Sequence, residues 1–243
     1  MTSRDVSRRV LGALREGPLG DSPVLVGSSG LFGFETAVPA LTEDVDVCVP
    51  ERLVADEGDA IVAALAERGY AHEHGTATFV SDDGVVFDLL GFGDPRDGDH
   101  IGGAGALRVM VFEDLSRIVG DANATTALEG GGRALTPAGF VASKLLTERA
   151  HKGSKDKLQA LLLLAERRHD EPFARELVAL LRAVDAIRLE DAAASAQDAM
   201  LALERDPAFT DAGAEGYGPV RTQVADGLGR FHALLDRVTG GHD

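Results

Sequence analysis

The sequence contains few of the residues that mark several large classes of protein. Its 243 residues include one cysteine, Cys48, two tyrosines and no tryptophan. A single cysteine excludes an intramolecular disulfide framework and is typical of proteins in a reducing compartment. No apolar run is long enough to cross a bilayer, and the N-terminal segment lacks the continuous apolar core of a secretory signal. We therefore expect a cytoplasmic globular protein with no membrane partner.

Lysine is also scarce, and acidic residues outnumber basic ones by 40 to 24. The net charge is −16, and lysine occurs four times, always between positions 144 and 157. An acidic surface repels phosphate backbones, so extensive, non-specific binding of nucleic acid is not expected. Local binding of a nucleotide or an RNA end, through metal ions and a few lysines, is compatible with this charge.

The hydrophobic pattern is that of a globular protein and changes along the chain. The first part alternates between strand and helix patterns, whereas the part after Thr136 has helical spacing almost throughout. This predicts an α/β (α+β) protein, with a mixed sheet in an N-terminal domain at 1–130 and a helical domain at 131–243. The predicted elements are an amphipathic helix within 1–17, a strand and turn within 22–30, a strand at 44–50, a helix within 59–70, a hairpin at 77–92 around Asp83-Gly84, a strand within 106–114, and helices within 136–151, 155–169, 171–205 and 218–238.

Two aspartates interrupt an apolar strand in the segment DVDVCVP. Side chains alternate along a strand, so Asp44 and Asp46 share one face. Asp88 lies among apolar residues on the second strand of the predicted hairpin. If these strands are neighbours, three carboxylates meet, and their repulsion favours a bound cation. Magnesium prefers such oxygens at roughly 2.0–2.1 Å, and three aspartates can hold two ions about 3.5–4 Å apart for in-line phosphoryl transfer. The alternative is that Asp44 and Asp46 are solvated on an exposed strand face.

The strand before these aspartates ends in a turn formed by Gly27 and Ser28. Backbone N–H groups and a hydroxyl exposed at such a turn can hold phosphate oxygens. The same residue types also occur at strand-to-helix turns for geometry alone. The functional interpretation gains support because the three aspartates and the lysine cluster accompany the turn.

Three segments together resemble a known signature. VGSSG at 26–30, TEDVDV at 42–47 and VVFDLL at 85–90 are similar to the motifs of the DNA polymerase beta-type nucleotidyltransferase superfamily. The stretch at 136–164 resembles the second signature of AbiEii-type toxin nucleotidyltransferases, a lysine and an arginine followed by a Lys-Asp pair that opens a helix. The matching residues are Lys144, Arg149, Lys155 and Asp156. The resemblance spans about 22–165.

The resemblance implies a role for each of these residues. Asp44, Asp46 and Asp88 would bind two Mg²⁺ ions and form the catalytic site, with Asp88 as the base for an attacking hydroxyl. Gly27, Ser28 and Lys144 would hold the triphosphate of an NTP, and Lys155 and Asp156 would lie at the rim of the same cleft. The acceptor would be a tRNA 3′ end, a protein side chain or a small molecule, and a toxin of this kind would have an antitoxin partner.

Structural alternatives exist for the second motif. Lys144 and Glu148 have the spacing of a surface ion pair on a helix, worth only about 0.2–0.5 kcal/mol. Asp156 in a first helical turn can simply complement the helix dipole. Arg149 can be structural as well.

Two departures from the pattern leave the function open. No basic residue precedes Asp44 in AVPALTED, where relatives often carry an arginine, and Gln159 stands where they often carry an aspartate. These departures motivate a second hypothesis, a catalytically silent module that binds a nucleotide or a partner. A third hypothesis is transfer to an aminoglycoside-like small molecule, whose positive charge suits an acidic cleft.

Other candidate sites have weaker patterns. His72 and His74 alternate in an acidic segment, where isolated histidines are mostly solvated. The segment with Asp94, Asp97, Asp99 and His100 resembles a cation loop without the spacing of an EF-hand. Cys48 lies among valines and is expected in the core, and GGAGAL at 102–107 is interpreted as a flexible link.

Overall fold

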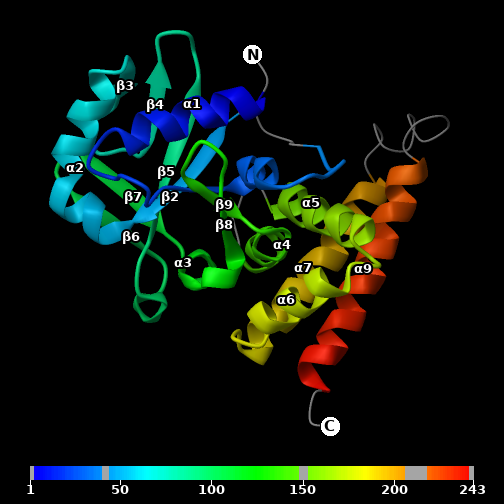
Figure 1. Ribbon diagram of the computed structural model, residues 1–243. Helices are drawn as coiled ribbons and strands as arrows, with labels where there is room; N and C mark the ends of the chain where they lie inside the picture. The colour runs from blue at the N-terminus through cyan, green and yellow to red at the C-terminus, as the bar shows by residue number, and fades with distance from the viewer. Residues whose placement is uncertain (1–2, 40–43, 148–152, 206–217, 241–243) are drawn as a thin grey trace. The chain divides into compact units, whose positions relative to one another are not determined.

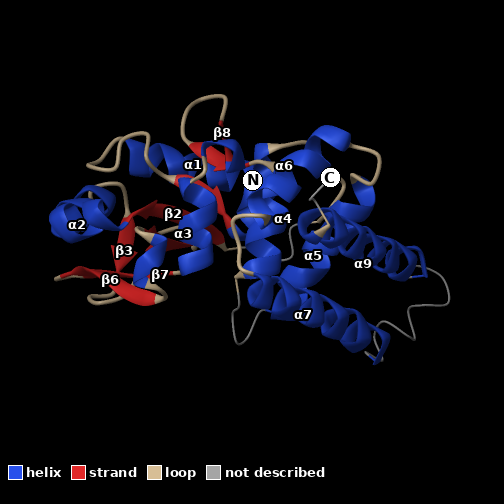
Figure 2. Ribbon diagram, turned by 90° about the horizontal axis from the view of Figure 1, so that it is seen from below, coloured by secondary structure: helices blue, strands red, loops and turns tan. Residues whose placement is uncertain are grey.

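The computed structural model describes residues 3–39, 44–147, 153–205 and 218–240. The chain forms two compact units, the first comprising Met1–Glu35 and Ala40–Thr136, and the second Thr36–Pro39 and Pro137–Asp243. A mixed β-sheet with helices is followed by a helical region, as predicted. The described strands all belong to the first unit (Figure 2).

The first unit contains a nine-stranded sheet with three α-helices and three short 3₁₀ segments. Its elements are α1 (Ser3–Arg15), β1 (Val24–Val26), η1 (Gly27–Gly33), β2 (Val45–Pro50), α2 (Glu51–Ala66), β3 (Tyr70–His72), β4 (Thr78–Ser81), β5 (Val86–Phe92), η2 (Pro95–Asp97), β6 (His100–Ala104), β7 (Leu107–Val111), α3 (Glu113–Gly120), η3 (Ala122–Ala124), β8 (Thr125–Ala127) and β9 (Arg133–Leu135). These bounds confirm the predicted N-terminal helix, the strands predicted within 22–30 and 106–114, and the hairpin. The strand predicted at 44–50 begins at Val45, and the helix predicted within 59–70 begins earlier, at Glu51, and ends at Ala66.

The sheet is mixed, and its centre is the parallel pair β2 and β5. The strand order is β3-β4-β5-β2-β1-β9-β8, with β7 also pairing with β5 and β6 pairing with β7. β2 runs antiparallel to β1 and parallel to β5, while β1 runs parallel to β9. Strands that are distant in the sequence are therefore brought together in the middle of one sheet.

The hydrophobic core of the first unit lies on one face of this sheet. α1 and α2 cover that face, and Figure 1 shows α1 lying over the strands. Leu25 of β1 and Val45 and Val47 of β2 point into this core. Because side chains alternate along a strand, Asp46 and Cys48 point to the opposite face. Cys48 is fully buried, as predicted.

The second unit is built from five described helices, and its described part contains no strand. They are α4 (Pro137–Leu146), α5 (Gly153–Glu166), α6 (Glu171–Leu181), α7 (Ala186–Arg205) and α9 (Gly218–Thr239). α5 packs against α4, α7 and α9. The segment Thr36–Pro39 also belongs to this unit, because Glu166 at the end of α5 accepts hydrogen bonds from Thr36 Oγ1 and Ala37 N, each at 2.9 Å.

The division between the units falls later than the predicted boundary after residue 130. That position lies in the connection between β8 and β9. β9 pairs in parallel with β1, so the hairpin belongs to the sheet, and the chain enters the second unit after Thr136.

The interpretation of GGAGAL as a flexible link is wrong. Residues up to Ala104 form β6, which pairs antiparallel with β7 from Leu107 onward. Glycine is needed there because the strand passes close to α2. A Cβ at Gly103 would lie 2.8 Å from Val54 Cγ1, and one at Gly102 would lie 2.7 Å from Glu51 Cγ. The glycines suggested a link because glycine is unusual inside a strand. They occur in β6 because larger side chains would not fit against α2.

Candidate functional site

Asp46 and Asp88 lie directly opposite each other on neighbouring strands. The parallel ladder of β2 and β5 begins with Val45 opposite Phe87 and continues with Asp46 opposite Asp88. Register partners project from the same face, so both carboxylates lie on the side away from the α1 and α2 core. Asp46 is only 5% exposed, whereas Asp88 is half-buried. The sheet therefore concentrates negative charge at one point of its centre.

The Gly27 turn is in direct contact with this point. Val26, the last residue of β1, is the register partner of Asp46, and Gly27 follows with φ +57°. A Cβ at Gly27 would overlap Oδ2 of Asp46 and lie 2.7 Å from its Cγ. Only glycine therefore allows the backbone to turn and the Asp46 carboxylate to lie against it. Ser28 and Ser29, next in η1, are both buried.

Replacing Gly27 with alanine is expected to destabilise the protein by about 2–4 kcal/mol, because a positive φ and a steric overlap act together. Gly20→Ala is the matched control, since Gly20 has φ +52° and a Cβ added to it would meet nothing within 4 Å. It should cost only about 1 kcal/mol. Urea unfolding of both variants measures the difference, and equal losses of stability would contradict close contact between Gly27 and Asp46.

Thr78 is a site residue that sequence reasoning missed. It is the register partner of Asp88 on β4, and its hydroxyl donates a 2.6 Å hydrogen bond to Asp88 Oδ1. The signal was present in the predicted hairpin, whose Asp83-Gly84 turn sets β4 against β5 and so brings Thr78 opposite Asp88. This hydrogen bond fixes the orientation of one Asp88 oxygen.

Asp44 lies in a bend immediately before β2 and is half-buried. Its carbonyl oxygen accepts a hydrogen bond from Ser29 Oγ at 3.4 Å. Because the ladder with β5 begins at Val45, the register does not carry Asp44 into the pair formed by Asp46 and Asp88. Among the residues that the structure describes, no three His, Cys, Asp or Glu side chains form a group able to hold one metal ion.

The two paired aspartates fit a magnesium ion shared with a substrate. Magnesium is usually bound by one or two carboxylates together with substrate phosphates and water, and Asp46 and Asp88 supply two carboxylates on one sheet face. A second ion requires a further ligand, for which Asp44 is the nearest predicted residue in the chain. The metal-binding roles of all three aspartates stay predictions.

The sheet face that carries the aspartates continues into exposed apolar side chains. Leu90 follows Asp88 on the same face of β5 and is the register partner of Met110 on β7. Met110 is in turn opposite Ile101 on β6. Met110 is 41% exposed and Ile101 65% exposed. An apolar contact surface therefore lies beside the carboxylates.

The residues predicted in the second motif lie in the helical unit. Lys144 of α4 forms an ion pair with Asp156 in the first turn of α5, and the two residues are 5% and 8% exposed. Lys144 is therefore no surface residue, and Asp156 does more than complement a helix dipole. Lys155 is exposed. Arg149 and Glu148 lie outside the described residues.

Two neighbouring polar residues that sequence reasoning did not assign to this cluster have structural partners. Lys157 is buried and donates to the carbonyl oxygens of Leu145 at 2.6 Å and Thr147 at 3.5 Å, so its charge lies at the C-terminal end of α4. Gln159, noted for its departure from the family pattern, is buried and donates to the Pro39 carbonyl at 2.9 Å. A glutamine can make this bond and an ionised aspartate cannot.

The other candidate residues have local structural partners. His72 stacks on Phe79, with ring centroids 4.7 Å apart, and its Nε2 lies 3.1 Å from the Thr76 carbonyl oxygen. His74 is exposed. Neither belongs to a metal-binding group within the described ranges.

The segment that resembles a cation loop is held by its own hydrogen bonds. Asp94 pairs with Arg96, and Asp99 Oδ1 accepts from the backbone N–H of Glu113 at 2.7 Å. His100 contacts the Gly98 carbonyl and Glu51, each at 2.9 Å, and these two hydrogen bonds raise the pKa of His100 above its ordinary value. A group of metal ligands is not formed there by the described residues.

A comparison with models of known protein families finds no match, and a comparison with curated proteins also finds none. Within the described chain, none of the helices combines the length and the apolar character needed to span a membrane.

Proposed function

We propose that the protein is a magnesium-dependent nucleotidyltransferase that moves a nucleoside monophosphate from an NTP to a hydroxyl group. The observation that carries this proposal is the register of β2 and β5, which sets Asp46 opposite Asp88, together with the Gly27 turn against Asp46. A pair of carboxylates beside a backbone turn after a strand suits a metal-bound triphosphate.

In the proposed reaction, the acceptor oxygen attacks the α-phosphorus of the NTP. The bond from that phosphorus to the oxygen bridging to the β-phosphate breaks, and pyrophosphate leaves. Asp88 accepts the hydroxyl proton through the oxygen that does not bind Thr78. Magnesium, when held by Asp46 and Asp88, would neutralise charge on the phosphates. The backbone at Gly27 and Ser28 would position the triphosphate.

The resemblance assigns further nucleotide contacts to the residues of the second motif. Lys144 is already paired with Asp156, so its ammonium group is held in one position. Lys155 is exposed and can be reached by a ligand. We assign Lys144, Lys155 and Asp156 to nucleotide binding within this proposal.

The acceptor is proposed to be a protein hydroxyl. Apolar side chains at Leu90, Met110 and Ile101 beside the carboxylates suit a protein surface, and the net charge of −16 disfavours long RNA contacts. A tRNA 3′ end and a cationic small molecule are the competing acceptors. As part of the same proposal, the protein acts as a toxin in the cytoplasm, and an antitoxin protein inhibits it.

The test is incubation of the protein with each α-labelled NTP and Mg²⁺, with protein extract, total tRNA or an aminoglycoside as separate acceptors. Label on one acceptor class, with release of pyrophosphate, supports the proposal and identifies the class. Labelling should disappear when EDTA removes the metal. If no acceptor is labelled at any NTP, transfer is excluded.

A nucleotide-binding module without catalysis is the second candidate. The position of Asp44 before the ladder favours it, since the described residues form no three-ligand metal group. NTP binding by calorimetry, in a protein that labels no acceptor, would establish this candidate.

A further inference from the structure

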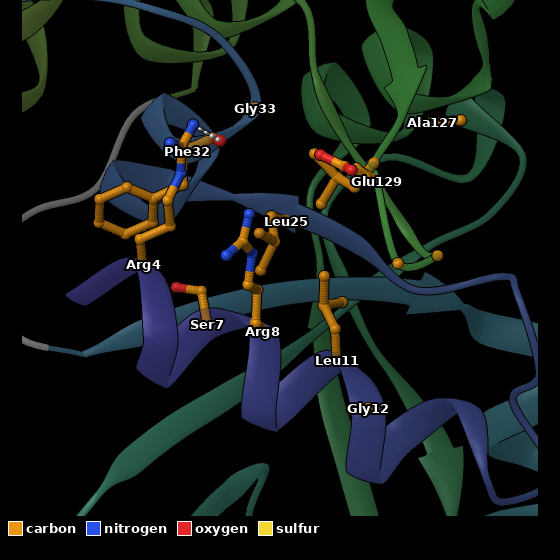
Figure 3. Close-up of a pocket in the computed structure, with 13 residues that line it drawn as sticks. Arg4, Ser7, Arg8, Leu11, Gly12, Leu25, Phe32, Gly33, Ala127 and Glu129 are labelled. Carbon is orange, nitrogen blue, oxygen red and sulfur yellow. Dashed lines mark hydrogen bonds between the residues drawn. The ribbon is translucent and has the colours of Figure 1, made fainter. Parts of the chain in front are cut away.

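A pocket of 330 Å³ lies in the first unit on the sheet face opposite the aspartates (Figure 3). Leu25 lines this pocket, and its neighbour Val26 is the register partner of Asp46, so the two sites lie on opposite faces of β1. Its walls come from α1, η1 and the connection between β8 and β9. The volume is at the lower end of the range for small-molecule sites.

Two arginines of α1 line the pocket without a carboxylate between them. Arg4 and Arg8 are four residues apart, so their side chains lie side by side on the helix and repel each other (Figure 3). Arg4 also lies in the first turn of α1, where the helix dipole disfavours positive charge. Arg4 Nη2 donates to the Phe32 carbonyl at 3.1 Å, and Arg8 forms no hydrogen bond or ion pair with any described residue. An anion in the pocket would relieve this arrangement.

Ser7 provides an independent indication of a ligand. It lies between the two arginines on α1, lines the same pocket and is 1% exposed. Its hydroxyl is buried and has no hydrogen-bond partner in the described part of the chain. A buried hydroxyl without a partner is unfavourable, and a bound ligand oxygen would satisfy it.

The opposite wall of the pocket is preorganised and carries a negative charge. Glu129 and the glycines at 130–131 line it. Arg15 holds this connection in place, because its Nη1 donates to the Gly130 carbonyl at 2.6 Å while its Nε pairs with Asp21 at 2.6 Å. Glu129 would repel a second anionic group and accept hydrogen bonds from a hydroxyl or amine. The apolar side chains of Leu25 and Phe32 also line the pocket.

We propose that this pocket binds a small metabolite with one phosphate or carboxylate group. Arg4 and Arg8 hold the anionic group, the Ser7 hydroxyl donates to one of its oxygens, and the rest of the molecule lies against Leu25, Phe32 and Glu129. The site is separate from the one that contains Asp46, and it does not depend on the nucleotidyltransferase proposal.

The test is calorimetric titration of the whole protein at low ionic strength with inorganic phosphate and, separately, with acetate. One of the two anions is expected to bind saturably with one site per chain, and the stronger binder identifies the anionic group. Arg8→Gln should weaken that binding roughly 10- to 100-fold, because a charged hydrogen bond is lost. Ser7→Ala should weaken it about 2- to 10-fold without lowering the melting temperature of the ligand-free protein.

Two control variants distinguish binding in this pocket from anion binding elsewhere on the protein. Arg9→Gln is the matched control on the same helix, since Arg9 pairs with Asp83 at 2.7 Å and does not line the pocket. Asp46→Asn controls for anions bound at the other face. Both should bind the probe as the unaltered protein does. The proposal would be overturned if neither phosphate nor acetate binds. It would also be overturned if Arg8→Gln and Arg9→Gln weaken anion binding equally.

Discussion

Asp46→Asn is expected to reduce nucleotide transfer roughly 10²–10³-fold. Asparagine keeps the size of the side chain beside Gly27 but lacks the charge that attracts a divalent cation. Asp88→Asn should cause a loss of the same order, because the two carboxylates lie opposite each other and are proposed to act on one substrate. Initial rates of labelled nucleotide transfer at saturating Mg²⁺ measure both effects.

Thr78→Val separates positioning from chemistry in the same experiment. The variant keeps the shape of Thr78 and removes the 2.6 Å hydrogen bond to Asp88 Oδ1. Because Thr78 acts through Asp88, we expect a smaller loss of about 10- to 100-fold and a higher Mg²⁺ requirement. If Asp46→Asn transfers nucleotide at the rate of the unaltered protein, Asp46 has no catalytic role. This conclusion would hold whatever the other two variants do.

The stability of Asp46→Asn should distinguish a lost function from a lost fold. The melting temperature of this variant is measured beside its transfer rate, because Asp46 is buried in the centre of the sheet. A loss of transfer at an unchanged melting temperature is attributed to the missing carboxylate and not to unfolding.

The pairing of Asp46 with Asp88 was within reach of the sequence, whereas the position of Asp44 was not. Alternation along DVDVCVP places Asp46 away from the valines, and the Asp-Gly turn fixes the hairpin that carries Asp88. The same alternation placed Asp44 on that face, but the strand begins only at Val45. Strand ends depend on which neighbour forms the ladder, and local sequence does not specify that neighbour.

Short strands and pockets escaped prediction for a related reason. β3, β8 and β9 contain three residues each, too few for a periodic pattern, and they are held by partners elsewhere in the sheet. The pocket beside Ser7 requires the connection between β8 and β9 to pack near α1, more than a hundred residues away in the chain. The sequence of the N-terminal helix alone does not indicate that this connection packs near it.

The second motif shows how a surface pattern can conceal a buried contact. The spacing of Lys144 and Glu148 matched a surface ion pair on one helix, and Asp156 matched an ordinary first-turn acid. Lys144 instead pairs with Asp156 of the next helix inside the second unit. The partner of a buried charge follows from helix packing, which the sequence does not give directly.

Lys144→Met is therefore expected to destabilise the protein by about 3–5 kcal/mol, because it leaves the Asp156 carboxylate buried without this cation. Lys155→Met is the matched control, since Lys155 is an exposed lysine of the same motif and should change stability by no more than about 0.5 kcal/mol. Urea unfolding of both variants measures the difference. A similar, small effect of both substitutions would show that the Lys144–Asp156 pair does not hold α4 against α5.

The double variant Lys144→Met with Asp156→Leu then separates stability from nucleotide binding. Replacing both members of a buried ion pair by apolar residues of similar volume is often neutral, so most of the lost stability should return. If Lys144 serves the proposed function, NTP affinity and transfer should stay low in this restored protein, since no ammonium group is present. If NTP affinity and transfer return together with stability, the Lys144–Asp156 pair is structural. Nucleotide binding by this motif would then depend on Lys155, which is exposed.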